Sequence, residues 1–206
     1  MNEKTCYLVG AGDASPLPEI KETDLLIAVD GGLCTCLAQK KTPHLLVGDL
    51  DSLADAPPPE IPLLRFPVKK DETDTYLAYL EGVARGYTHF EIYGGLGGRA
   101  DHTIANLQLL RRIAAEGRTA ALVGADARML AFADGTVTLA TLPGQSLGVF
   151  ALSEVCEGVT IEGAAYSLTK GTLKNDFPLG VSNTALGESV TLTVEKGTLL
   201  AVLSSV

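Results

Sequence analysis

The chain has 206 residues, of which 46% are hydrophobic and 20% are charged, a balance typical of a globular protein with one or two domains. Its formal net charge of −9 argues against a protein whose main task is to bind nucleic-acid backbones, since such binding needs Lys and Arg. No apolar run approaches the ~20 residues that cross a membrane, and the N-terminal segment lacks a signal-peptide core. No CxxC pair occurs among the cysteines. We therefore expect a cytoplasmic protein with reduced cysteines.

Six short apolar runs in the first two thirds of the chain predict β-strands. They cover residues 6–10, 25–30, 44–49, 62–68, 89–94 and 119–124. Strands that are apolar over nearly their whole length are typical of a parallel sheet, because helices cover both of its faces. These runs therefore favour a buried, parallel sheet over a half-solvated antiparallel one.

Two segments between these runs predict helices, at residues 74–86 and 100–117. Their apolar residues recur at helical spacing, as Leu77, Leu80 and Val83 in the first segment and as Ile104, Leu107, Leu110 and Ile113 in the second. A glycine ends each segment. Strands that alternate with helices imply βα units, so we expect an α/β domain with an open, mainly parallel sheet and flanking helices.

The pattern changes near residue 133. From there, β-rich runs broken by Gly, Pro and Asn follow one another with no helix between them, at residues 136–142, 146–152, 158–163, 189–197 and 198–205. This spacing predicts a smaller, all-β, sandwich-like domain. We therefore expect two domains, residues 1–132 and 133–206. The second would have a thin core by itself, so we expect it to pack on the first domain or on another subunit.

The stretch VGDLDS places Asp49 and Asp51 one residue apart at the end of an apolar run. On an extended segment, residues i and i+2 point to the same side, so the two carboxylates would repel each other. A bound cation, or protonation of one acid, would offset this repulsion. The alternative is a solvated turn, in which Asp and Ser are common.

More polar residues follow the other predicted strands, at the edge where open α/β sheets bind ligands. They are Asp30, Gly31 and Gly32 in AVDGG, Lys69, Lys70, Asp71, Thr73 and Asp74 in VKKDETDTY, and Arg99, Asp101 and His102 in GGLGGRADH. Each has a structural alternative as a turn residue, a helix N-cap, a partner of the helix dipole or a solvated side chain. Their common edge favours a single site.

The segment GLGGRA, residues 95–100, fits the G-x-G-x-x-A fingerprint of dinucleotide-binding proteins, so a nicotinamide or flavin enzyme is one alternative. The segment lies in a late βα unit, however, and no acid ends a strand about 20 residues further on. Glycine-rich turns at helix starts bind phosphates in general, because their N–H groups and the helix dipole favour anions. We interpret this turn, with Gly97 and Gly98, as a phosphate cradle in which Arg99 is a clamp.

Four motifs, in this order, resemble those of the thiamine pyrophosphokinase family: GDLDS (48–52), KDETDTYLA (70–78), GGLGGRADH (94–102) and the SN pair (182–183). The resemblance extends over essentially the whole chain. It implies a Mg²⁺-dependent enzyme that transfers the diphosphate of ATP to the hydroxyl of thiamine, giving thiamine diphosphate and AMP. It also implies a homodimer with thiamine bound near the subunit interface, and no nucleic-acid or membrane partner.

The resemblance also implies roles for individual residues. Asp49, Asp51 and Asp74 match the Mg²⁺-binding acids of the family. The residues expected to bind nucleotide are Asp30, Gly31, Gly32, Lys70, Asp71, Thr73, Gly97, Gly98 and Arg99, and those expected to bind thiamine are Asp101, Tyr166, Ser182 and Asn183. The chain departs from the family in having no Trp, which many members carry near Tyr166, and in having Lys70 where some members have a neutral residue.

These residue types suit the implied chemistry. Mg²⁺ prefers oxygen ligands and commonly bridges one or two carboxylates to substrate phosphates. Phosphoryl-type transfer depends mainly on positioning and on stabilising charge. The expected catalytic residues are Asp49, Asp51, Asp74, Arg99 and Asp101, the last of which would either orient or deprotonate the hydroxyl. Two alternatives remain, a pyrophosphokinase for another alcohol such as a pterin and a non-catalytic module that binds Mg²⁺ and nucleotide.

Overall fold

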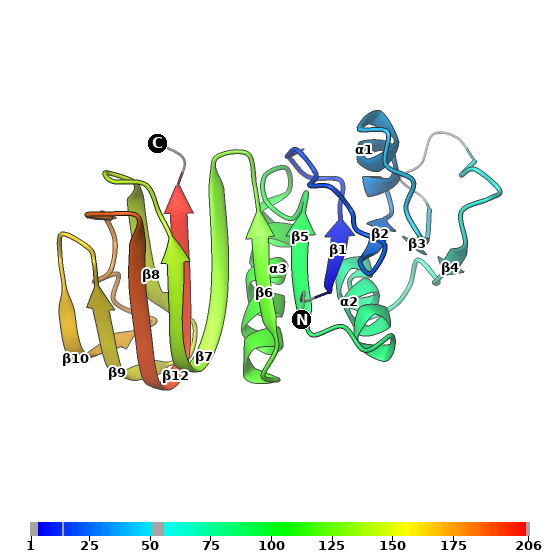
Figure 1. The fold of residues 1–206 in the computed structure, drawn as a ribbon. Coiled ribbons are helices and arrows are strands. Elements are labelled where there is room, and N and C mark those ends of the chain that lie inside the picture. Colours follow the sequence, from blue (N-terminus) through cyan, green and yellow to red (C-terminus); the bar gives the residue numbers. More distant parts are fainter. Residues whose placement is uncertain (1–3, 14, 51–55, 205–206) are drawn as a thin grey trace. The chain divides into compact units, whose positions relative to one another are not determined.

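The structure is a computed structural model that describes residues 4–13, 15–50 and 56–204 (Figure 1). The chain forms two compact units. Unit 1 takes in the described residues of Met1–Leu109 and Leu122–Ala125, and unit 2 those of Leu110–Ala121 and Asp126–Val206.

Unit 1 is built on a parallel sheet, drawn in blue to green in Figure 1. Its strands, in the spatial order β5-β1-β2-β3-β4, all run in the same direction. They are β1 (Thr5–Val9), β2 (Leu25–Val29), β3 (Leu45–Gly48), β4 (Leu63–Arg65) and β5 (His89–Tyr93). Every residue of β1, β2 and β3 is buried, as expected for strands covered on both faces. The sixth predicted strand forms as β6 (Thr119–Val123). The α/β prediction is confirmed.

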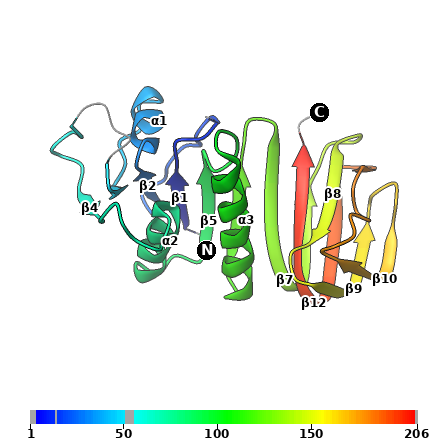
Figure 2. The ribbon, with the colours of Figure 1, turned by 180° about the vertical axis from the view of Figure 1, so that it is seen from behind.

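Two helices cover opposite faces of this sheet. Successive residues of a strand point to opposite sides. Tyr7 and Val9 of β1 share a buried cluster with Cys36 of α1 (Gly32–Ala38), whereas Cys6 lies against α2 (Asp74–Ala84) at Gly82. The short helix α1 was not predicted. Figure 2 shows α2 and the longer α3 (Ala100–Ala115) from behind.

The predicted apolar stripe of α2 is wrong. The buried residues are Ala78, Tyr79 and Gly82, whereas Leu80 is 39% exposed. The reason is that the Tyr79 ring packs edge-on against Phe90 of β5, with ring centroids 4.9 Å apart, and so turns this face of the helix inward. In α3 the predicted apolar stripe is half correct, because Leu110 and Ile113 are buried whereas Ile104 is 59% exposed. No helix among the described residues is long and apolar enough to span a membrane.

Unit 2 contains the sandwich-like all-β domain. Its strands are β7 (Ala127–Ala140), β8 (Ser146–Ala151), β9 (Val155–Glu162), β10 (Leu168–Lys174), β11 (Asn183–Thr184) and β12 (Ser189–Ser204). The predicted all-β class is confirmed, although the runs at 189–197 and 198–205 form one strand rather than two. Strand β7 extends through residue 133, and the predicted domain boundary there stays a prediction.

Strand β12 organises this unit. It pairs antiparallel with β7 along its length, with a register shift between Val194 and Thr198. The half of β12 before the register shift also pairs with β9, and the half after the shift also pairs with β8. Residues from β8, β9 and both halves of β12 form one buried core, for example Val149, Val159 and Leu192.

Candidate functional site

The carboxyl ends of β2 and β3 meet around Asp30. This residue has a positive φ of 45°, its N–H donates to the Val47 carbonyl at 3.0 Å, and its Oδ1 accepts the Leu50 N–H at 3.4 Å. Gly48 has φ +152°, and a Cβ on it would overlap the Asp30 carboxylate, so only glycine fits here. The chain that follows β3 is therefore held directly beside Asp30.

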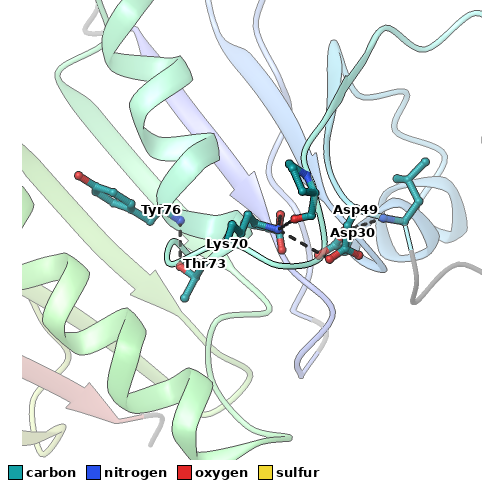
Figure 3. Close-up of polar contacts among 8 residues, drawn as sticks. Asp30, Asp49, Lys70, Thr73 and Tyr76 are labelled. Carbon is teal, nitrogen blue, oxygen red and sulfur yellow. Dashed lines mark hydrogen bonds and ion pairs between the residues drawn. The ribbon is translucent and has the colours of Figure 1, made fainter.

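Lys70 contacts two of the predicted acids, Asp49 and Asp74. Its Nζ lies 2.8 Å from Asp74 Oδ1 and 3.7 Å from Asp49 Oδ2. It also donates to the Pro67 carbonyl at 3.2 Å. The Lys70 and Asp49 side chains are each 10% exposed and that of Asp74 is 17% exposed. Figure 3 shows Lys70 reaching toward Asp49 and Asp30. The structure thus brings together Asp30, Asp49, Lys70 and Asp74.

The charges at this point are unbalanced. Burial, the charge of Asp74 and a hydrogen bond with it raise the pKa of Asp30 to about 6, and Asp49 adds to the effect. Burial by itself would lower the pKa of the Lys70 ammonium, but its hydrogen bond to Asp74 and the charges of the three acids raise it. Three carboxylates therefore surround one ammonium, which leaves the cluster with an excess of negative charge.

The start of α2 positions Asp74. Thr73 is the N-cap, with an extended backbone at φ −75° and ψ 151°, and its hydroxyl accepts the Tyr76 N–H at 3.2 Å. Asp74 occupies the first turn, where the helix dipole favours a negative charge. Asp71 is exposed. The structure thus gives Thr73 a capping role, whereas its contact with nucleotide stays a prediction.

Arg99 and Asp101 contact each other in the glycine-rich loop. Arg99 donates from Nε to Asp101 Oδ1 at 3.1 Å and from Nη2 to Oδ2 at 2.6 Å. Both side chains are exposed, at 73% and 63%. Hydrogen bonding to Asp101 raises the pKa of Arg99, and hydrogen bonding to Arg99 lowers the pKa of Asp101. The pair is an exposed, bidentate fork at the start of α3.

One residue beside this loop was not among the predicted site residues. The Asp13 N–H donates to the Leu96 carbonyl at 3.0 Å. Gly97 has φ +72°, and a Cβ on it would overlap the Asp13 carboxylate, so the carboxylate lies directly on this glycine. The sequence contains a signal for this residue, because GAGD places Asp13 shortly after β1, just as Asp49 follows β3. Asp13 belongs to the same edge of the sheet as the glycine loop.

In unit 2, Asn183 holds the segment that carries Tyr166. Its Oδ1 accepts the N–H groups of Tyr166 and Thr184, both at 2.9 Å, and its Nδ2 donates to the Tyr166 carbonyl at 2.7 Å. Asn183 is 5% exposed, whereas Tyr166 is 72% exposed. Ser182 has a positive φ of 59°. The Asn183 amide is therefore occupied by backbone contacts, and the Tyr166 ring is free to meet a ligand.

The remaining predicted residues fall into two groups. Gly31 and Gly32 lie at the start of α1, where Gly31 is the N-cap and Gly32 is buried. Asp51 lies outside the described residues.

Within residues 4–13, 15–50 and 56–204, no three His, Cys, Asp or Glu side chains are already arranged as metal ligands. Asp49 and Asp74 share the Lys70 ammonium as a partner.

Comparison with known proteins matches both parts of the chain. Residues 18–122 match the family model of the thiamin pyrophosphokinase catalytic domain, and residues 136–199 match that of the thiamin pyrophosphokinase vitamin B1 binding domain. A thiamine pyrophosphokinase of Bacillus subtilis is 26% identical, with 98% of this chain and 99% of that protein covered.

Solved structures agree with this assignment. The crystal structure of thiamine pyrophosphokinase from Bacillus subtilis has a TM-score of 0.87 at 25% identity and covers 98% of this chain and 99% of that one. The structure from Geobacillus thermodenitrificans has a TM-score of 0.84 at 26% identity, with 98% of each chain covered. The structure from Candida albicans, at 14% identity, shares the fold with a TM-score of 0.75, 98% of this chain and 90% of that chain being covered. The first family model alone spans more than half of the residues, and the chain belongs to the thiamine pyrophosphokinase family.

Proposed function

We propose that this protein transfers the diphosphate group of ATP to the hydroxyl of thiamine, with Mg²⁺, and releases AMP. The observation that carries the proposal is the convergence of Asp49 and Asp74 on one cation position at the carboxyl edge of the parallel sheet, in a chain of this family. We place the reaction in the cytoplasm, where ATP is available.

The residues fit a magnesium ion. Asp49 and Asp74 offer hard carboxylate oxygens and both lie within 4 Å of one cation, the Lys70 ammonium. Burial raises the pKa of Asp30, and the charges of Asp74 and Asp49 add to this effect. Asp51 would join them by its place in the sequence. Asp49 and Asp74 would hold the ion, which would supply positive charge to offset the negative charge that develops during transfer.

The other residues of unit 1 would bind and orient the phosphates. The positive φ of Gly97 and Gly98 lets this turn present N–H groups to an anion, and the planar fork of Arg99 suits two phosphate oxygens. Arg99 would have to exchange Asp101 for phosphate. Lys70 would add a second positive charge. The exchange would remove the Arg99 hydrogen bond that lowers the pKa of Asp101, which would then orient or deprotonate the hydroxyl.

Unit 2 would bind the vitamin and a second subunit. The exposed ring of Tyr166 suits the cationic thiazolium of thiamine. Four large apolar side chains between residues 177 and 186 of the same unit are also more than half exposed, namely Phe177, Leu179, Val181 and Leu186. Such a group of exposed apolar side chains is typical of an interaction surface. We therefore propose a homodimer with thiamine bound near this surface, Ser182 and Asn183 shaping the site.

The test is an incubation of the protein with ATP, Mg²⁺ and thiamine, followed by mass spectrometry. We expect AMP and thiamine diphosphate in equal amounts, and neither product when Mg²⁺ is chelated. A pterin alcohol and a nicotinamide dinucleotide serve as matched controls for the alternative substrates. Transfer to the pterin but not to thiamine, or nucleotide binding without AMP formation, would overturn the proposal.

A further inference from the structure

The Lys70 ammonium lies against the two acids that the proposed function assigns to the metal. Its ammonium has one close carboxylate, Asp74 at 2.8 Å, and one more distant carboxylate, Asp49 at 3.7 Å. A third contact, at 3.2 Å, is the backbone carbonyl of Pro67. The Lys70 side chain is 10% exposed, so most of it is covered by protein. All of these groups belong to unit 1.

We propose that Lys70 is an internal counter-ion that holds the acid cluster together without metal and competes with Mg²⁺ for Asp49 and Asp74. The inference rests on the proposed function in one respect, that these two acids are the metal ligands. It adds that metal binding displaces the ammonium. The displaced side chain is then available to phosphate, so Mg²⁺ binds weakly alone and well together with ATP.

The physical argument is one of charge compensation. Carboxylates that are removed from water destabilise a protein unless a cation accompanies them. The Asp49 and Asp74 side chains are 10% and 17% exposed, and the charges of Asp74, Asp49 and Asp30 each raise the pKa of Lys70. A divalent ion offers twice the charge to the same oxygens. The Lys side chain is long and flexible, so its ammonium moves out of the cluster without a change of backbone.

Two variants of Lys70 test the competition in opposite directions. We measure Mg²⁺ binding to the full-length, nucleotide-free protein by isothermal titration calorimetry. Lys70→Gln removes the competing charge and should tighten Mg²⁺ binding about tenfold, equivalent to ~1.4 kcal/mol. Lys70→Arg keeps the charge and adds a fork that grips carboxylates bidentately, so it should weaken Mg²⁺ binding. Lys69→Gln is the matched control, because it removes the same charge from the exposed neighbouring residue.

A second readout is the thermal stability without metal. Lys70→Gln should have a lower Tm than the wild type in a chelator, and Mg²⁺ should raise its Tm by more than it raises that of the wild type. Lys69→Gln should change neither value.

Three results would overturn the inference: equal or weaker Mg²⁺ binding by Lys70→Gln, equal effects of Lys69→Gln and Lys70→Gln, or no Mg²⁺ binding by either wild type or Lys70→Gln. If Lys70→Gln does not fold, tighter Mg²⁺ binding by Lys70→Arg than by the wild type would likewise overturn the inference. Formation of AMP is scored separately. An inactive protein in which Lys70→Gln still tightens Mg²⁺ binding would refute the proposed function and leave the role of Lys70 intact.

Discussion

Replacement of Asn183 by Ala should destabilise unit 2, although the hydrogen bonds of this side chain to Tyr166 and Thr184 all go to backbone groups. The Asn183 amide makes three hydrogen bonds, two of them to the backbone of Tyr166 and one to that of Thr184. The side chain is 5% exposed, so water replaces these bonds poorly. The variant removes all three and leaves the Tyr166 backbone without its partner.

The magnitude follows from these contacts. A hydrogen bond contributes roughly 1 kcal/mol net, and a buried group left without a partner costs roughly 1–3 kcal/mol. Because the Tyr166 side chain is largely exposed, water can reach part of its backbone, which reduces the second effect. We expect a loss of about 2–3 kcal/mol in the free energy of unfolding, or a fall in Tm of about 5–10 °C for a chain of this size.

Circular dichroism during urea and thermal unfolding measures this loss. Asn175→Ala is the matched control, because Asn175 is exposed and its hydrogen bond, to Glu154, uses the backbone N–H. The reasoning predicts a clear difference between the two variants. If Asn183→Ala loses no more than ~0.5 kcal/mol, as a typical surface substitution does, Asn183 does not hold the Tyr166 segment.

The remaining predictions concern chemistry and charge. Asp49→Asn and Asp51→Asn should each lower turnover by at least ~10²-fold in limiting Mg²⁺, equivalent to ~2.7 kcal/mol, with the fold intact by circular dichroism; near-normal rates would remove them from the metal site. Arg99→Lys should impair turnover although the charge is kept, and an unchanged ATP dependence in steady-state kinetics would make Arg99 an ordinary surface residue. Tyr166→Ala should raise the KM for thiamine about 5–30-fold and leave that for ATP nearly unchanged, whereas equal effects on both would indicate lost folding. Asp30→Asn should stabilise the metal-free protein by about 1–2 kcal/mol above pH 6, a value reduced for partial solvent screening, and by nothing below pH 4. Burial and neighbouring acids raise the pKa of Asp30 in the native state to about 6, so the wild-type protein loses stability as the pH rises through this window. Parallel melting curves for the two proteins across this pH range would contradict the prediction.

The sheet of unit 1 could be predicted because its strands are buried on both faces. Such strands are short, continuously apolar runs, and β1 and β2 are buried at every residue. Helix α1 could not be predicted in the same way, because its seven residues are too few to show a helical period. The buried face of α2 depends on Tyr79 and Phe90, which meet only after the sheet has formed.

The candidate site could be predicted as a set of residues but not as a set of contacts. Strand order brings the ends of β2 and β3 and the start of α2 to one edge, so Asp30, Asp49 and Asp74 lie close together, whereas their role as a site stays a prediction. The position of Lys70 among them depends on its side-chain rotamer, which no sequence pattern encodes. The same holds for Asn183, whose amide bonds the backbone of a residue on a different segment.

Strand β12 has a consequence for how unit 2 reaches its native state. Its residues pair with β7 from Ser189–Ala140 to Ser204–Ala127, and its two halves also recruit β9 and β8. Long stretches of chain separate all of these partners, and chain entropy has to be lost before any such contact forms. Folding of this unit should therefore be slow, with a high contact order, because the pairing of β9 with β10 and of β8 with β11 leaves the central partner of β7, β8 and β9 missing until β12 arrives.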